Sequence, residues 1–253
     1  MSASSDSENT DNNTSTTEAK AKSGLGGKIL RVVGLLAVFG VIIAAVGASM
    51  QHTDAPVEVW YEDMTVGNLD AKNHFIIYSD IACPYCLAFE NAIIEHEDDF
   101  RRYIEANDIL VEVRLADFLY EYGESKSIES RYSAEAIYCA KDEGKFLDYY
   151  NKAVTKVWNE YYRDAGKSAF SEFNKLGKDY WLDLGKSVGL GDDFKNCLTS
   201  DDTLSAVKSD AKRMARLVDG MPYFKFNKYI ASGFDRSWVW NYVKMYFDAG
   251  LKS

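Results

Sequence analysis

The chain has 253 residues, 47% of them hydrophobic and 14% aromatic, so it can build one or two domains around a sizeable core. This composition excludes a chain that is disordered throughout. The formal net charge of -10 at pH 7 also argues against binding nucleic acid, whose phosphates attract surfaces rich in Lys and Arg.

The N-terminal end combines a polar tail with an apolar segment. Residues 1–28 are mainly Ser, Thr, Asn, Asp, Gly and Lys, and they bury too little apolar area to become ordered. Residues 29–50 follow, and the stretch 32–50 is uncharged and long enough to cross a hydrocarbon core of roughly 30 Å as one helix. Lys and Arg precede this segment while Asp and Glu follow it, which predicts a cytoplasmic tail and an extracytoplasmic body. We therefore expect a single-pass protein of the cell membrane with a folded domain over residues 51–253.

A cleaved signal peptide is the alternative for this segment, because small residues at 46–48 could be a cleavage site. The apolar run is longer than the usual 7–15 residues of a signal sequence, which favours a retained signal-anchor. After it, residues 51–73 should form a short tether that leads into a first strand near 57–61.

A strand, a turn and a helix are expected around the first two cysteines. Residues 75–79, FIIYS, form an apolar, β-favouring run. The residues after the turn follow a helical period, with one apolar stripe. This stripe comprises Cys86, Phe89, Ile93, Phe100 and Ile104.

The spacing of this pair points to redox chemistry. Pro84 fits the first position of the helix, which puts Cys83 at the helix N-terminus. Unpaired amides and the helix dipole stabilise a thiolate there, so we expect Cys83 to be the exposed, attacking sulfur. Cys86, one turn later, should lie deeper and resolve the mixed disulfide.

A metal site and a purely structural bridge are the alternatives for the pair. Zinc needs two further ligands, whereas the other cysteines are not closely paired and the three histidines show no ligand spacing. A structural bridge between Cys83 and Cys86 would close too small a loop to restrict the unfolded chain much. We therefore predict no metal site and a redox-active pair.

Residues 220–234 predict a β-hairpin with a turn near Asn227–Lys228, followed by a helix with an aromatic stripe. Pro222, one of only three prolines, lies at the start of the first hairpin strand. It could simply initiate the strand. Alternatively, a cis bond after Met221 could present the Met221 backbone to a substrate beside the sulfurs, which sequence alone does not decide.

Together these motifs resemble those of the DsbA-like thiol oxidoreductases, exported enzymes with a thioredoxin fold that introduce disulfides into secreted proteins. The resemblance covers about residues 57–250. The motifs that carry it are D-x-x-C-P-Y-C-x-x-F-E at 80–90, YCAKDEGKFLDYY at 138–150, FKNCL at 194–198 and GMPYFKFN at 220–227.

The resemblance implies an α/β thioredoxin-like fold with an inserted helical subdomain over about 120–218, preceded here by the transmembrane helix. It implies that Cys83 is the nucleophile, Cys86 the resolving thiol and Pro222 a cis-proline. A helical stripe from residue 147 to 161 agrees with the insertion.

Cys139 and Cys197 both fall within the insertion, and the resemblance implies a structural disulfide between them. The alternative is a pair of buried free thiols.

Several positions depart from the family pattern. The strongest oxidases have His where this chain has Tyr85, which brings no positive charge to the thiolate. Thioredoxins hold a buried acid where this chain has Ile77, so Asp80 and Glu90 are the nearest candidates for proton handling. Each of these acids could instead be a solvated charge or a helix-end residue. Met221 replaces a smaller or branched residue, which could alter substrate preference.

The resulting hypothesis is a membrane-tethered disulfide oxidase that acts on reduced secreted proteins and needs no dissociable cofactor. The family implies a quinone-linked membrane partner, DsbB-like or VKOR-like, that reoxidises the enzyme. A disulfide reductase or isomerase on the same fold is the nearest alternative. A non-catalytic, membrane-anchored binding module is another, and it would leave Cys83 buried and inert.

Overall fold

The central strand of the sheet is the apolar run that the sequence predicts before the first cysteines. β3 (Asn73–Ser79) is buried on both faces from Phe75 onward, which explains its nearly continuous apolar sequence. In the described part of the chain the sheet has six strands in the order β1-β6-β5-β3-β4-β2. The others are β1 (Gln51–His52), β2 (Thr65–Val66), β4 (Ile109–Leu115), β5 (Tyr223–Phe226) and β6 (Tyr229–Ser232).

This computed structural model describes residues 51–52, 58–123, 126–164, 168–218, 220–232 and 239–253. The predicted tail and signal-anchor, residues 1–50, lie outside these ranges. None of the helices within the described ranges has the length and hydropathy needed to cross a membrane.

The sheet contains both parallel and antiparallel strand pairs, and each kind is joined by a different connection. β3 and β4 are parallel, and the chain between them forms α2 (Pro84–Ile94) and α3 (Glu97–Ala106). β5 pairs antiparallel with both β3 and β6. The β5–β6 hairpin turns at Asn227, whose φ of 52° suits Asn, and this confirms the predicted hairpin.

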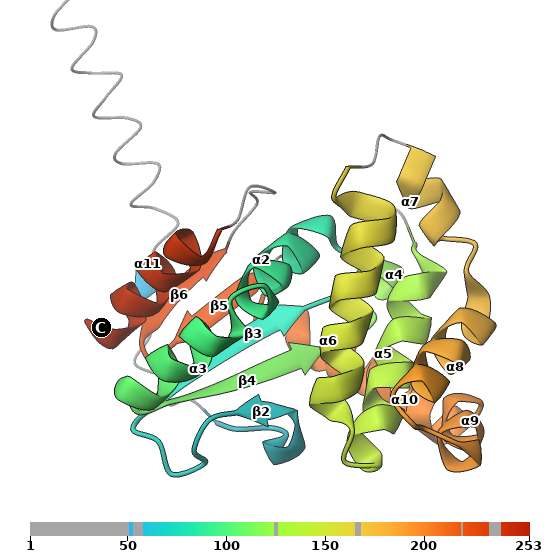
Figure 1. The fold of residues 1–253 in the computed structure, drawn as a ribbon, viewed down its shortest axis with the longest axis horizontal. Coiled ribbons are helices and arrows are strands. Elements are labelled where there is room, and N and C mark those ends of the chain that lie inside the picture. The colour runs from blue at the N-terminus through green and yellow to red at the C-terminus, as the bar shows by residue number, and fades with distance from the viewer. Residues whose placement is uncertain (1–50, 53–57, 124–125, 165–167, 219, 233–238) are drawn as a thin grey trace, which may run out of the picture. The chain divides into compact units, whose positions relative to one another are not determined.

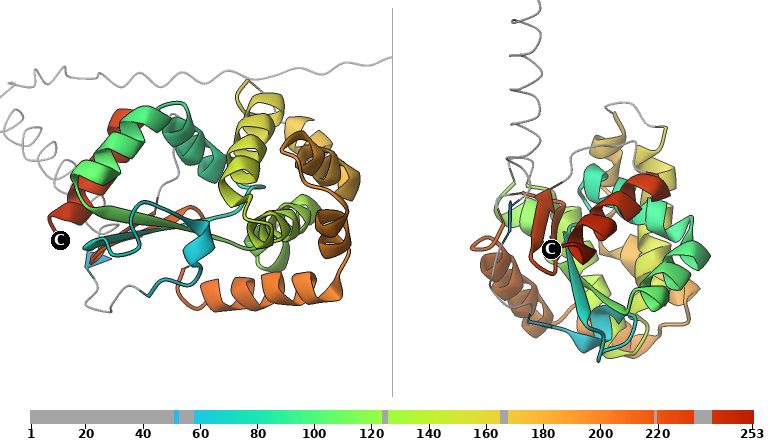
Figure 2. Two further views of the ribbon diagram at one scale, coloured as in Figure 1. Left: turned by 60° about the horizontal axis from the view of Figure 1, so that its bottom comes forward. Right: turned by 90° about the vertical axis from the view of Figure 1, so that its left-hand side faces the viewer.

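Different helices cover the two faces of the sheet (Figures 1 and 2). α2, α3 and α11 (Trp240–Leu251) pack on one face, against side chains such as Phe75, Ile77 and Phe224. α10 (Asp201–Met214) packs on the opposite face, against Ile76 and Tyr78. In the left view of Figure 2, α10 lies below the sheet and the other three helices lie above it.

The helical insertion separates β4 from β5, as predicted. Most of it lies at the carboxyl end of β3 and β4 (Figure 1), and its last helix, α10, packs on the face of the sheet. The apolar core of the insertion also includes Leu87 of α2, and Val113 and Leu115 of β4. Its helices are α4 (Phe118–Glu121), α5 (Ile128–Asp142), α6 (Phe146–Val157), α7 (Ser168–Phe173), α8 (Gly177–Ser187), α9 (Asp192–Leu198) and α10, with a π-helical turn at Trp158–Tyr162.

Two local predictions differ from the structure. The prediction of a strand near 57–61 is wrong for the described residues 58–61. The backbone amides of Trp60 and Tyr61 donate to the side chain of Glu112, at Oε1, and not to a neighbouring strand. A 3-10 turn, Glu62–Met64, follows instead. The helical stripe after Cys86 also spans two helices, because His96 leaves the helical conformation with a ψ of 36°.

Candidate active site

The turn between β3 and α2 sets the position of the first cysteine. The Cys83 amide donates to the Asp80 carbonyl oxygen at 2.9 Å, which closes the turn. Cys83 is the N-cap of α2 with an extended backbone, and Pro84 follows in the first helical turn. No amide of that turn is capped by the Cys83 side chain. The sulfur therefore lies where unpaired amides and the helix dipole favour a negative charge.

Both sulfurs lie below the surface, which corrects the expectation of an exposed Cys83. Cys83 is 4% exposed and Cys86 is 0% exposed. Met221 contributes to this cover, since its carbonyl oxygen lies 3.6 Å from Cys83 Sγ and its side chain joins the same apolar cluster. The bond between Met221 and Pro222 is cis, and the partly buried Tyr85 packs against this cluster as well.

The environment of Cys86 disfavours its thiolate. Burial raises the pKa of the Cys86 thiol well above its ordinary value, and the adjacent Cys83 sulfur and the Glu90 carboxylate raise it further. The two cysteines are therefore electrostatically unequal, because only Cys83 is at the helix N-terminus.

Glu90 lies one turn beyond Cys86 on α2 and is 3% exposed, so the interpretation as a solvated charge is wrong. Burial raises the pKa of Glu90 to about 8. The hydroxyls of Ser79 and Tyr150 lower it in part, although neither makes a hydrogen bond of normal geometry to the carboxyl group. Glu90 is consequently protonated at neutral pH and can exchange a proton with a neighbouring group.

Asp80 is also fully buried, so it is not a solvated charge either, but its partners give it a different role. Its carboxylate accepts hydrogen bonds from the amides of Ala82 and Leu119, both at 2.8 Å, and from the Ser130 hydroxyl at 2.6 Å. Burial nevertheless raises the pKa of Asp80 to about 6. These bonds tie the turn before Cys83 to α4 and α5, which makes Asp80 a positioning residue.

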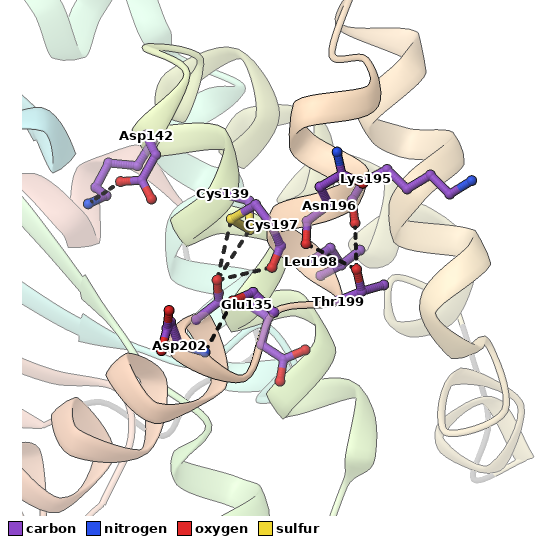
Figure 3. Close-up of a disulfide and its surroundings, with 12 residues drawn as sticks. Glu135, Cys139, Asp142, Lys195, Asn196, Cys197, Leu198, Thr199 and Asp202 are labelled. Atoms are coloured by element: carbon purple, nitrogen blue, oxygen red, sulfur yellow. Dashed lines mark hydrogen bonds and ion pairs between the residues drawn. A yellow bond between two sulfur atoms is a disulfide. The ribbon is translucent and has the colours of Figure 1, made fainter.

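The second pair of cysteines forms the disulfide that the resemblance implied. Cys139 of α5 and Cys197 of α9 are bonded, with their Cα atoms 5.7 Å apart (Figure 3). The Thr203 hydroxyl, 3.4 Å from Cys197 Sγ, donates to the Cys197 carbonyl oxygen at 3.0 Å. This bridge joins two helices of the insertion, in contrast to Cys83 and Cys86, which are free thiols.

Sequence reasoning did not assign Ser79, Ser130 or Tyr150 to the site. Tyr150 belonged to the apolar stripe of its helix, and nothing in that pattern marks a tyrosine that faces a carboxyl group. Within the described residues, no group of three or more His, Cys, Asp or Glu side chains could hold a metal ion.

A family model described as thioredoxin matches residues 61–237, which is more than half of the chain. The chain belongs to the thioredoxin family. A search of curated proteins finds no match.

Solved structures extend this assignment to the fold. Oxidised BdbD from Bacillus subtilis is 18% identical over 80% of this chain and 100% of its own, with a TM-score of 0.56. ScsC from Proteus mirabilis in a transitional conformation is 16% identical over 92% and 98%, with a TM-score of 0.50. The thiol-disulfide exchange protein alpha-DsbA2 from Wolbachia pipientis is 18% identical over 73% and 85%, with a TM-score of 0.49.

The predicted thioredoxin-like α/β fold with added helices is therefore confirmed for the described residues. The part of the resemblance that concerns a thioredoxin fold thus agrees with the family match, and the likeness to BdbD is one of fold.

Proposed function

We propose that this chain is an extracytoplasmic thiol:disulfide oxidase, with Cys83 as the reactive sulfur and Cys86 as the resolving sulfur. The observation that carries the proposal is the inequality of the pair. Cys83 caps α2, whereas Cys86 is fully buried beside the protonated Glu90. A thiolate stabilised at the helix N-terminus favours the reduced enzyme, which makes its disulfide a better oxidant.

The reaction begins with the Cys83–Cys86 disulfide. A substrate thiolate attacks Cys83 Sγ, so the substrate–Cys83 bond forms, the Cys83–Cys86 bond breaks and Cys86 leaves as a thiolate. A second substrate thiolate then attacks the substrate sulfur of this mixed disulfide and releases Cys83 as a thiolate. The substrate gains a disulfide, and two electrons pass to the enzyme.

Glu90 is the proposed proton donor to Cys86. A thiolate released in this buried position must take up a proton, because burial raises the pKa of Cys86. Glu90 holds a proton up to about pH 8 and lies one helical turn away. Asp80 is less suited to this role, since three hydrogen bonds already engage its carboxylate.

Met221 and Pro222 are the proposed support for the substrate chain beside Cys83. The Met221 carbonyl oxygen lies 3.6 Å from Cys83 Sγ, so a substrate segment that reaches the sulfur must pass this backbone. Tyr85 borders the same cluster and brings no charge, which should make the pair less oxidising than one with a cation there.

The cellular setting is proposed from the sequence. The uncharged stretch 32–50 would tether the domain outside the cytoplasm, where disulfides persist. Each catalytic cycle leaves the Cys83–Cys86 pair reduced, so turnover needs an oxidant. We propose a quinone-linked membrane protein, DsbB-like or VKOR-like, and no dissociable cofactor on this chain. Extraction of membranes at alkaline pH should leave the full chain in the pellet, and release into the supernatant would contradict the tether.

The equilibrium potential of Cys83–Cys86 in the full-length protein against glutathione tests the direction of electron flow. We expect a value between about -270 mV, typical of thioredoxin, and about -120 mV, typical of the strongest periplasmic oxidase. The protein should also oxidise a reduced, unfolded substrate faster than it reduces insulin. A potential at or below the thioredoxin value, with strong insulin reduction, would favour the reductase alternative.

The low exposure of Cys83 favours a second candidate, a non-catalytic module that binds unfolded chains. Alkylation kinetics of the reduced protein separate the two. An oxidoreductase should have Cys83 modified much faster than Cys86, whereas an inert module should have neither modified before unfolding.

A further inference from the structure

A cavity of about 420 Å³ lies on the α10 face of the sheet, and neither Cys83 nor Cys86 lines it. The register of three neighbouring strands places the side chains that form the floor of this cavity. Tyr78 of β3 is paired with Arg114 of β4 and with Tyr223 of β5, so these three side chains share one face. Lys225 lies on the same face, two residues along β5. The volume is within the range of small-molecule sites.

The walls come from two segments that meet on this face of the sheet. Trp60 contributes from the segment before β2, and Arg213 and Arg216 contribute from the C-terminal end of α10 and the residues after it. The guanidinium carbons of Arg114 and Arg213 lie 3.9 Å and 3.4 Å from the centroid of the Trp60 ring. Two positive charges are thus held against one indole.

Among the described residues that line this cavity, cations outnumber acids, although the chain as a whole carries a net charge of -10. Of the described residues that line it, four are cations, namely Arg114, Arg213, Arg216 and Lys225, and one, Glu58, is an acid. Glu58 pairs with Arg213 at 3.4 Å, but Glu58 is largely exposed and Arg213 about half exposed, so this pair contributes little.

Arg114 provides an independent sign of a ligand. Its side chain is only 3% exposed, and it pairs with the buried Glu112 at 2.8 Å. Its Nη1 donates to the Tyr78 hydroxyl at 2.9 Å and its Nη2 donates to the Glu58 carbonyl oxygen, so that only its Nε is buried without a hydrogen-bond partner among the described residues. Burial and the charge of Arg114 also lower the pKa of Lys225. Arginines at the end of α10 could serve only to neutralise the helix dipole, but that role would not involve Arg114 or Lys225.

We propose that this cavity binds a ligand that carries a carboxylate beside a planar apolar group. The guanidinium groups of Arg213 and Arg216 match a carboxylate, and the rings of Trp60, Tyr78 and Tyr223 offer an apolar wall to the rest of the ligand. Two sources share this chemistry, a small organic acid and an acidic residue next to an aromatic residue in a polypeptide. Tyr223 follows Pro222 directly, so a bound polypeptide would lie near the reactive cysteines.

Calorimetric titration of the full-length protein tests the site with matched probes. Phenylacetate should bind, whereas phenylacetamide, its neutral analogue, should not. Acetyl-Phe-Glu-amide and acetyl-Phe-Gln-amide form the polypeptide arm. Tighter binding of the acidic peptide than of phenylacetate identifies a polypeptide source, and the reverse order identifies a small organic acid.

Exposed arginines supply variants that should fold. Arg213→Gln and Arg216→Gln should each weaken binding of the acidic probe about tenfold, the loss expected for one charge-assisted hydrogen bond. Arg102→Gln is the control, because it removes the same charge from an exposed side chain of α3 that pairs only with Asp99. Trp60→Phe should remove the change in fluorescence that accompanies binding.

Equal binding of the acid and its amide, or no binding of either acidic probe, would overturn the proposal. So would an Arg102→Gln variant that weakens binding as much as the two cavity variants. Inorganic phosphate that binds as tightly as phenylacetate would overturn the role of the aromatic wall.

Discussion

The two cysteine pairs of this protein differ in spacing and surroundings, and these differences separate chemistry from structure. Cys83 and Cys86 lie within one helical turn and are free thiols at the start of α2. Cys139 and Cys197 are 58 residues apart and join α5 to α9. A bridge across so few residues constrains little, whereas a bridge across 58 residues restricts the unfolded chain strongly.

The polar neighbours of the two pairs differ in the same way. Glu90, Ser79 and Tyr150 surround the buried side of the first pair with groups that can move a proton. Beside the second pair lies the Thr203 hydroxyl, which is engaged with the Cys197 carbonyl oxygen. The comparison therefore predicts that only the first pair exchanges electrons with a substrate.

The largest expected effect is on activity. Cys83→Ser should reduce the oxidation of a reduced, unfolded model protein to the uncatalysed rate, because no sulfur remains at the helix N-terminus. The double variant Cys139→Ala/Cys197→Ala should keep most of the activity when assayed at a temperature where it is folded. Comparable losses in both would mean that the two pairs are not separate in function.

The next effect is on stability. Loss of the Cys139–Cys197 bridge should lower the free energy of unfolding by about 4 kcal/mol, from the loop-closure entropy of the unfolded chain. Denaturant unfolding of the double alanine variant and of the parent, both with Cys83 and Cys86 reduced, measures this difference. A change below about 1 kcal/mol would indicate that the insertion is held by its apolar core alone.

Glu90 should make stability depend on pH. Its pKa is about 8 when folded against an ordinary value of 4.5, so between these values the folded state binds more protons than the unfolded state. Stability must then fall as pH rises through this window. From pH 5 to pH 7 the parent should lose about 2.5 kcal/mol more than Glu90→Gln, which does not titrate.

Unfolding of both proteins at several pH values checks this prediction. Glu95→Gln is the matched control, because Glu95 ends the same helix and is about half exposed, in an ion pair with Arg163. Parallel pH dependence in the parent and in Glu90→Gln would show that Glu90 is ionised in the folded protein.

The smallest effect concerns the link between the insertion and the active-site turn. Ser130→Ala removes one of three hydrogen bonds to Asp80 and should cost about 1 kcal/mol of stability while raising the pKa of Asp80 further. Ser133→Ala is the control on the same buried helix face, since its hydroxyl donates to the Ser130 carbonyl oxygen and not to Asp80. Carboxyl titration by NMR should show a shift of Asp80 in the first variant alone.

Patterns of local sequence predicted the parts of the fold that depend on neighbours in the chain. The strand before Cys83, the helix from Pro84 and the hairpin at Asn227 follow from apolar period, helix-start geometry and turn chemistry. The prediction of a strand near 57–61 was wrong, because Glu112, which is distant in sequence, accepts the backbone hydrogen bonds that a strand would need.

The buried side of the site could not be predicted in the same way. Nothing local distinguishes Glu90 from the exposed Glu95 on the same helix, because burial depends on packing against α6. Ser130 reaches Asp80 across 50 residues of sequence. Met221, which contributes to the cover of Cys83, is 138 residues away in the sequence.

The central claim is that Cys83 forms the mixed disulfide and Cys86 resolves it. Reduced Cys86→Ser should attack oxidised glutathione, so that a Cys83–glutathione disulfide forms and one glutathione thiolate leaves. Peptide mass spectrometry of the full-length protein after acid quenching locates this adduct. We predict rapid, stable modification of Cys83 in Cys86→Ser and almost none of Cys86 in Cys83→Ser over the same time. Equal modification of the two cysteines, or modification of Cys86 alone, would contradict the account.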